Sequence, residues 1–153
     1  MTPQDQSLSA TGINLIDELV GLFVTNFVNP NQQNFDEFLS IVYTKLDATG
    51  FFSELEILKV DDSELSLLFP SSSTSISASA FHEPLFNNDI IQHKTSVFSL
   101  ENSTVFLSYI HNITKPQFLI YANKKHNIQN RLISSMLNAV STLLSNLITR
   151  YPI

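Results

Sequence analysis

Apolar positions repeat with a helical period at both ends of the chain. Residues 13–28 are mostly apolar, and one polar stripe has spacings of three and four residues, at Asn14, Glu18, Gly21 and Thr25. This pattern predicts a helix that is covered on more than one side. Residues 127–150 carry an apolar stripe that predicts a long closing helix before Pro152. The other face of that helix is small, polar and uncharged: Ser134, Ser135, Asn138, Ser141, Thr142, Ser145 and Asn146.

A further helix is predicted over residues 34–48. Asn34 is a favourable N-cap, and Asp36 and Glu37 place negative charge in the first turn, where the helix dipole favours it. Gly50 can end this helix, because glycine readily adopts the left-handed conformation of a C-terminal cap.

The middle of the chain contains runs that are typical of β-strands. They cover residues 51–60, 65–69, 95–100, 104–111 and 117–122. The acidic stretch between the first two runs predicts a hairpin turn. In the fourth run Val105, Leu107 and Tyr109 alternate with Phe106 and Ile110. A strand that is apolar on both faces is a central strand with a cover on each side.

The order of these elements predicts one α+β domain over residues 11–153, with its core in residues 34–122, after a flexible N-terminus. We expect an antiparallel sheet of five or six strands, with the long N- and C-terminal helices on one face. The Ser- and Thr-rich loop of residues 71–79 and a short helix over residues 83–92 are expected on the other face.

Charge is sparse and unevenly distributed. Charged residues make up 14% of the chain, against roughly 25% in typical soluble domains. Residues 1–76 hold eleven acidic and two basic residues (−9), and residues 77–153 hold three acidic and six basic residues (+3). The scattered cations argue against binding of nucleic acid. A surface with few charges is easily desolvated, which favours a protein partner or a dimer. A source proteome that is rich in Asn would give the same low fraction of charged residues.

The chain has no cysteine, which excludes disulfides, thiolate metal sites and covalent thioether cofactors. The N-terminus lacks the pattern of a signal peptide. Asp17 and Glu18 interrupt the first apolar stretch, which is too short and too charged to span a bilayer. We therefore expect a cytoplasmic protein with no membrane contact and no cofactor.

No pattern of catalytic or metal-binding residues stands out. His82 and His93 have no recognised ligand spacing, and the acidic hairpin turn lacks the glycine and the distal glutamate of a calcium loop. The chain has no Gly-x-Ser-x-Gly motif and no phosphate-binding loop. His111 and His126 flank a turn and a helix and are expected at the surface. We expect no metal site and no enzyme activity.

The stretch from Ser103 to Lys125, followed by the helix from Asn127, resembles the last hairpin and the closing helix of a GAF domain. The order of elements also resembles, more loosely, the roadblock and longin domains. Cyclic-nucleotide GAF domains carry an Asn-Lys pair, a Phe and then an Asp-Glu pair. Asn123-Lys124 matches the first pair, but Ile128 and Leu132-Ile133 replace the rest. The resemblance therefore does not imply cyclic-nucleotide binding.

The GAF resemblance implies a regulatory or sensory module that binds a small ligand between the sheet and residues 76–94. The candidate ligand-binding residues are Phe81, His82, Phe86, His93 and Phe98. Core packing of the aromatic residues and solvent exposure of the histidines are the alternative reading. The alternative function is a ligand-free scaffold of the roadblock or longin type, which docks another protein through its helices and acidic hairpin.

A homodimer held by the terminal helices is also expected. The uncharged outer face of the closing helix would let two helices approach closely, with Ser135, Asn138 and Thr142 at the interface. GAF domains that resemble this chain often pair in this way. The alternative is that the first helix covers the last helix within a single chain.

Overall fold

The fold combines helices with a run of five strands in an α+β arrangement. The computed structural model of the protein describes residues 14–15, 17–21, 32–61, 64–70, 95–100, 102–112, 115–125 and 128–150. The elements, in chain order, are α2 (Gln32–Ala48), β1 (Phe52–Asp61), β2 (Glu64–Phe69), β3 (Ser96–Ser99), β4 (Thr104–Asn112), β5 (Lys115–Lys124) and α4 (Asn130–Arg150). The predicted loop of residues 71–79 and the predicted short helix of residues 83–92 lie outside the described residues.

The described strands form one five-stranded sheet in the order β2-β1-β5-β4-β3. All four strand pairs are antiparallel. β1 and β2 form the predicted acidic hairpin, in which Asp61 pairs with Glu64. The connection between β2 and β3 joins the two opposite edges of the sheet.

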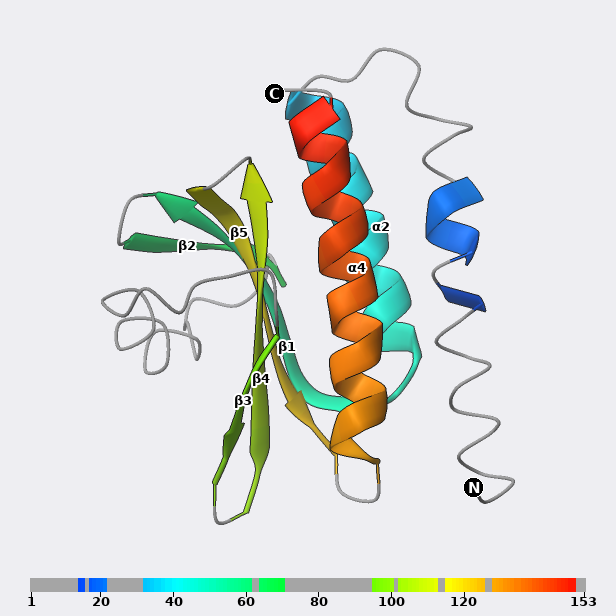
Figure 1. Cartoon of the computed structure of the whole chain (residues 1–153), viewed down its shortest axis with the longest axis vertical. Helices are drawn as coiled ribbons and strands as arrows, with labels where there is room; N and C mark the ends of the chain where they lie inside the picture. The colour runs from blue at the N-terminus through cyan, green and yellow to red at the C-terminus, as the bar shows by residue number, and fades with distance from the viewer. Residues whose placement is uncertain are drawn as a thin grey trace.

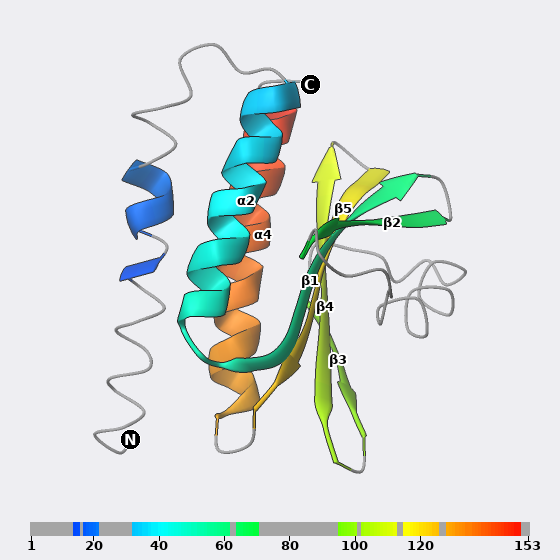
Figure 2. The ribbon, with the colours of Figure 1, turned by 180° about the vertical axis from the view of Figure 1, so that it is seen from behind.

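Helices α2 and α4 pack side by side and antiparallel on one face of the sheet (Figure 1). Helix α2 lies against β1, and α4 lies against β4. Viewed from behind, the described turns of the N-terminal helix lie outside this helical pair, on the side away from the sheet (Figure 2). The described residues therefore form three layers.

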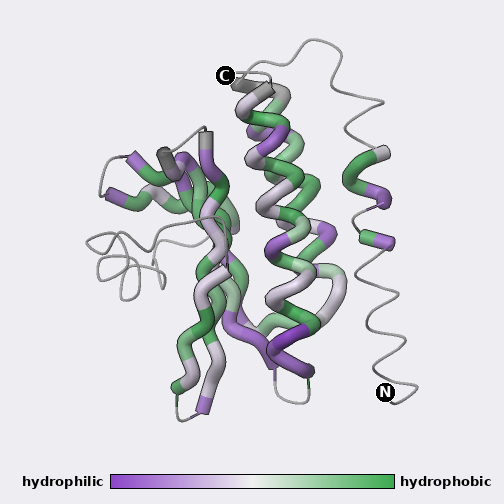
Figure 3. Tube along the Cα trace, viewed as in Figure 1, coloured by the Kyte–Doolittle hydropathy of each residue, from purple (hydrophilic) through white to green (hydrophobic). Residues whose placement is uncertain are grey.

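The sheet has an apolar cluster on each of its two faces. We call the side toward α2 and α4 the helix face, where Ile57, Phe106, Ile110 and Ile120 are fully buried with the helices. We call the opposite side the outer face; its buried residues are Leu58, Val60, Val105, Leu107, Tyr109, Leu119 and Tyr121. The predicted alternation along β4 is confirmed. Hydrophilic positions gather at the adjoining ends of β1 and β2 and at the start of α4 (Figure 3).

Helix α2 begins earlier than predicted. It starts at Gln32, so Asn34 lies inside its first turn and is not its N-cap. Glutamine is a good helix former, which favours this extension. The predicted end is confirmed, because Gly50 has a φ of 73° and its amide donates to the carbonyl of Asp47.

The boundaries of the last two elements also differ from the prediction. Strand β5 is longer than residues 117–122, because Asn112 and Lys115 still pair. Helix α4 begins at Asn130 and not at residue 127. Ile128 packs on the core without being helical, and the Lys124 ammonium donates to its carbonyl. This contact lies directly ahead of the first turn of α4.

Helix α4 is long and apolar enough to cross a membrane by length and composition alone. In this fold it is a core helix. Ile133, Leu137, Val140 and Leu144 are fully buried against the sheet and α2.

The N-terminal helix is described only at residues 14–15 and 17–21. Leu15 and Leu19 are buried in the main core, whereas Val20 is 41% exposed. The Glu18 carboxylate and the Lys45 ammonium of α2 lie 2.7 Å apart. Within a single chain, the described turns thus bury one side, because they lie on the outside of α2; the expected cover on more than one side stays a prediction.

Candidate functional site

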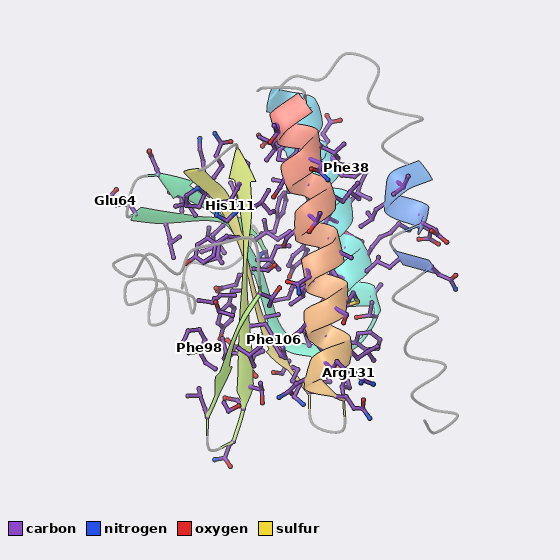
Figure 4. The ribbon with its side chains drawn as sticks, viewed as in Figure 1. Phe38, Glu64, Phe98, Phe106, His111 and Arg131 are labelled. Atoms are coloured by element: carbon purple, nitrogen blue, oxygen red, sulfur yellow. The ribbon has the colours of Figure 1, made fainter. Side chains whose placement is uncertain are left out.

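The outer face of the sheet carries the described part of the predicted ligand site. Phe98 on β3 is half-buried and packs against the outer cluster. It lies on the side of the sheet away from the helices (Figure 4). The next residue toward the N-terminus, Val97, is 41% exposed. The other predicted ligand-binding residues lie outside the described residues: Phe81, His82, Phe86 and His93.

The outer face is apolar at its centre and polar at one end. The Glu54 carboxylate accepts hydrogen bonds from the Tyr121 hydroxyl at 3.4 Å and from the Asn123 amide at 3.3 Å. Burial raises the pKa of Tyr109 above its usual range, so this phenol stays neutral. An apolar surface with a few oriented polar groups is typical of small-molecule sites.

A row of polar contacts, here called the polar seam, joins β4 to α4. Strand β3 pairs only with residues 104–107 of β4, so the rest of that edge needs other partners. The Asn138 carbonyl accepts from the Thr95 amide at 2.7 Å and from the Thr95 hydroxyl at 2.6 Å. The Ser108 hydroxyl bonds the hydroxyls of Thr95 and Ser141. Buried polar groups are satisfied here inside the chain.

The seam continues past a bulge in β4. The register shifts between Ile110 and His111, and the His111 amide donates to the Ser145 hydroxyl at 3.0 Å. His111 is only 3% exposed. The predicted surface position of His111 is therefore wrong. His111 continues the two-residue period of the buried residues Val105, Leu107 and Tyr109. That period was the signal in the sequence that His111 is buried.

The seam also changes the interpretation of the polar face of α4. That face was predicted to point outward, but Ser141 is only 4% exposed, Asn138 bonds to Thr95 just ahead of β3, and Ser145 bonds to His111 of β4. Ser135 and Thr142 are exposed. On the β4 edge, the Ser145 hydroxyl of α4 accepts from the backbone amide of His111. The homodimer itself stays a prediction.

A cavity of about 290 Å³ lies between β4 and α4, beside the seam. Strand β4 contributes an imidazole and a phenol, and α4 contributes hydroxyls and one amide. The lining residues are Tyr109, His111, Ser141, Thr142, Ser145, Asn146 and Thr149. The rings of Tyr109 and His111 have centroids 6.3 Å apart and an interplanar angle of 54°. Both rings are almost fully buried, at 4% and 3% exposed, and the exposed part of the lining is that of Thr142, Asn146 and Thr149 on α4.

Within the described residues, no group of three or more histidines and carboxylates could hold a metal ion. The predicted absence of a metal and the predicted lack of enzyme activity both stay predictions. The described sites offer apolar surface and hydrogen-bonding groups, among them the Glu54 carboxylate.

The fold is GAF-like. The structure is similar to the crystal structure of the A. aeolicus NLH2 GAF domain in an inactive state, with a TM-score of 0.64 and 13% sequence identity, over 94% of this chain and 98% of that chain. The fold and the resemblance expected from the sequence are confirmed. At this identity, the likeness concerns the fold alone. No family model matches the sequence. No curated protein matches it either.

Proposed function

We propose that the chain is a regulatory binding module that works without catalysis and senses a small ligand on the outer face of its sheet. The second apolar cluster carries this proposal. It lies on the face opposite α2 and α4, contains two tyrosines, and has the half-buried Phe98 at one edge. Residues 76–94 would form the other wall, because their segment connects the two edges of the sheet. We place the module in the cytoplasm.

The chemistry of this face indicates a ligand with an apolar body. The buried outer cluster offers aliphatic and aromatic surface. Its charged neighbour, Glu54, already accepts two hydrogen bonds. Phe81, His82, Phe86 and His93 are proposed as the remaining contacts.

A ligand-free scaffold is the second candidate, because the tip of the β1–β2 hairpin presents exposed Asp61 and Glu64. Limited proteolysis of residues 71–79 separates the two candidates. Under the ligand proposal, the small-molecule fraction of a cell extract slows cleavage. Under the scaffold proposal, only the macromolecular fraction does so.

Phe98→Ala is expected to abolish ligand retention while leaving the fold intact. The change removes an aromatic side chain from the outer cluster, where it contacts the ligand in our proposal. Native mass spectrometry of freshly purified protein should show a retained small molecule in the wild type and none in the variant. Val97→Ala is the matched control, because Val97 is 41% exposed and lies on the same strand. Equal retention in the wild type and Phe98→Ala would contradict this site.

The homodimer is proposed to use the exposed part of α4. Ser135→Glu and Thr142→Glu should each place like charges at the interface and give monomers without loss of folding. Asn138→Glu should also disturb folding, because Asn138 holds Thr95. Light scattering and circular dichroism measure the two effects. A wild-type protein that is monomeric at tens of micromolar would contradict the proposed homodimer.

A further inference from the structure

The backbone edge of β3 is not used by the proposals above. Strand β3 is the last in the order β2-β1-β5-β4-β3, and among the described strands it pairs only with β4. We infer that its free edge pairs antiparallel with β3 of a second copy, so that two sheets join into one across a twofold axis. This inference rests on the homodimer proposed above and gives that dimer a backbone interface.

The two edges of the sheet differ in how they are protected. On β2, exposed Glu64 begins the strand, Pro70 follows its end, and the register with β1 is irregular. Charge, proline and bulges keep an edge strand from pairing with another chain. Residues 95–100, which include β3, contain no charge and no proline, and the β3–β4 register is regular. Because Val97 is 41% and Leu100 is 49% exposed, this edge is the one open to pairing.

The β3–β4 pairing fixes which backbone groups point to the free edge. The Leu100 amide donates to the Ser103 carbonyl at 2.8 Å, so the backbone groups of Leu100 point toward β4. In an antiparallel pair, such residues alternate with residues whose N–H and C=O groups point away from the partner strand. The backbone groups of Val97 and Ser99 therefore point outward, as do those of Thr95 just ahead of β3.

The polar seam removes one of these three positions and so selects a register. The Asn138 side-chain carbonyl accepts from the Thr95 amide at 2.7 Å, which makes this amide unavailable to another strand. Val97 and Ser99 remain, and both are exposed. The register that uses both in each copy pairs Val97 of one copy with Ser99 of the other, and each such pair exchanges both N–H···O bonds. Phe98 then lies at the twofold axis.

A second copy of the strand suits this edge. Residues 95–100 carry no charge, so two copies of them do not repel each other. At the axis, Phe98 meets its own counterpart on the outer face, and aromatic cross-strand pairs stabilise a sheet. Leu100 lies diagonally opposite Phe98 of the other copy. The pairing therefore covers apolar surface that a single chain leaves exposed.

The β3 edge also adjoins the proposed helix interface. Ser135, Asn138 and Thr142 follow at spacings of four and three residues or fewer along one face of α4. Asn138 holds Thr95, and Ser135 and Thr142 are exposed on either side of it. A twofold axis at β3 places the exposed faces of both α4 helices on one side of the joined sheet. A strand pairing of four residues covers less area than a stable dimer needs, and α4 adds to it.

Ser99→Pro tests the backbone pairing. Proline has no amide and its ring obstructs a second strand, whereas an edge strand tolerates it. We expect the dissociation constant of the dimer, measured by light scattering over a dilution series, to rise by at least about tenfold. Ser99→Ala keeps the amide and removes only the hydroxyl, so it should dimerise like the wild type. Circular dichroism checks that both variants fold.

Val97→Lys tests the same edge with the backbone amides intact. Lysine is a residue that natural edge strands use against pairing, and we expect a similar loss of the dimer. Val20→Lys is the matched control, because Val20 is also 41% exposed and lies on the N-terminal helix. It should leave the dimer unchanged.

Hydrogen exchange followed by NMR locates the interface directly. The amides of Val97 and Ser99 should exchange more slowly in the wild-type dimer than in the Ser135→Glu monomer. A monomeric wild type would overturn both the homodimer and this inference. A dimer that Ser135→Glu dissociates, but that Ser99→Pro and Val97→Lys leave intact, would overturn the β3 pairing alone. So would fast exchange of both amides in the dimer, which would leave this edge to another occupant, such as an extended segment of a different protein.

Discussion

Replacing Phe106 by alanine is expected to lower the free energy of unfolding by about 3–5 kcal/mol. Phe106 is 0% exposed and lies between β4 and α4 (Figure 4). Its ring packs in the core on the helix face. The neighbouring residues are held in place by the sheet and the helices, so they can close the cavity left by the substitution only in part. Urea denaturation followed by circular dichroism measures the loss.

Phe98→Ala is the matched control for this variant, because it makes the same chemical change on the opposite face. Phe98 is half-buried, so less apolar area returns to water, and the loss should be roughly half as large or smaller. Equal losses for the two variants would show that the outer cluster supports the fold as strongly as the helix face does. The ligand proposal would then lose its premise that Phe98 can be removed without unfolding.

Strand faces and the overall fold could be predicted from the sequence because periodicity reports them directly. Val105, Leu107 and Tyr109 alternate with Phe106 and Ile110, and a strand places alternate residues on opposite faces. Element ends were harder to predict. The N-terminal extension of α2 and the late start of α4 depend on local contacts, such as that between Lys124 and Ile128, which leave no periodic signal.

The candidate sites could be predicted less well, because they depend on where strands stop. A small polar residue on a helix can face solvent, or it can satisfy a strand edge, and the sequence pattern is the same in both cases. Strand β3 pairs with β4 only as far as Leu107, and Asn138, Ser141 and Ser145 bond to groups beside or beyond the end of that pairing. Nothing in the sequence gives the length of that pairing.

The seam also gives a physical reason for the absence of charge in α4 between Arg131 and Arg150. A Lys or Glu at Ser141 would be buried against the sheet, where an unpaired charge is very costly. Short neutral hydroxyls and one amide can instead reach the donors and acceptors of β3 and β4 at normal distances. Internal hydrogen bonding thus accounts for part of the pattern that first suggested a dimer.

Ser141→Asp is the variant that tests the seam most severely. Ser141 is 4% exposed and bonds to Ser108, so an aspartate there buries a carboxylate without a cation. We expect a loss of at least about 4 kcal/mol at neutral pH, which is a large part of the roughly 5–15 kcal/mol that stabilises a domain. Thr142→Asp, at the next and exposed position, should change stability by no more than about 0.5 kcal/mol.

The pH dependence of Ser141→Asp separates the cost of charge from the cost of size. Burial should raise the pKa of the new carboxyl in the folded state above its unfolded value of about 3.9. The extra loss should therefore be nearly absent below about pH 3, well under the unfolded pKa, where both states are protonated, and should grow as the pH rises through the unfolded pKa until it levels off above the folded pKa. Urea denaturation at several pH values, at concentrations where light scattering gives a monomer, provides the measurement. A loss independent of pH would indicate steric strain, whereas full stability at neutral pH would mean that Ser141 is open to water and that the seam between β4 and α4 does not form.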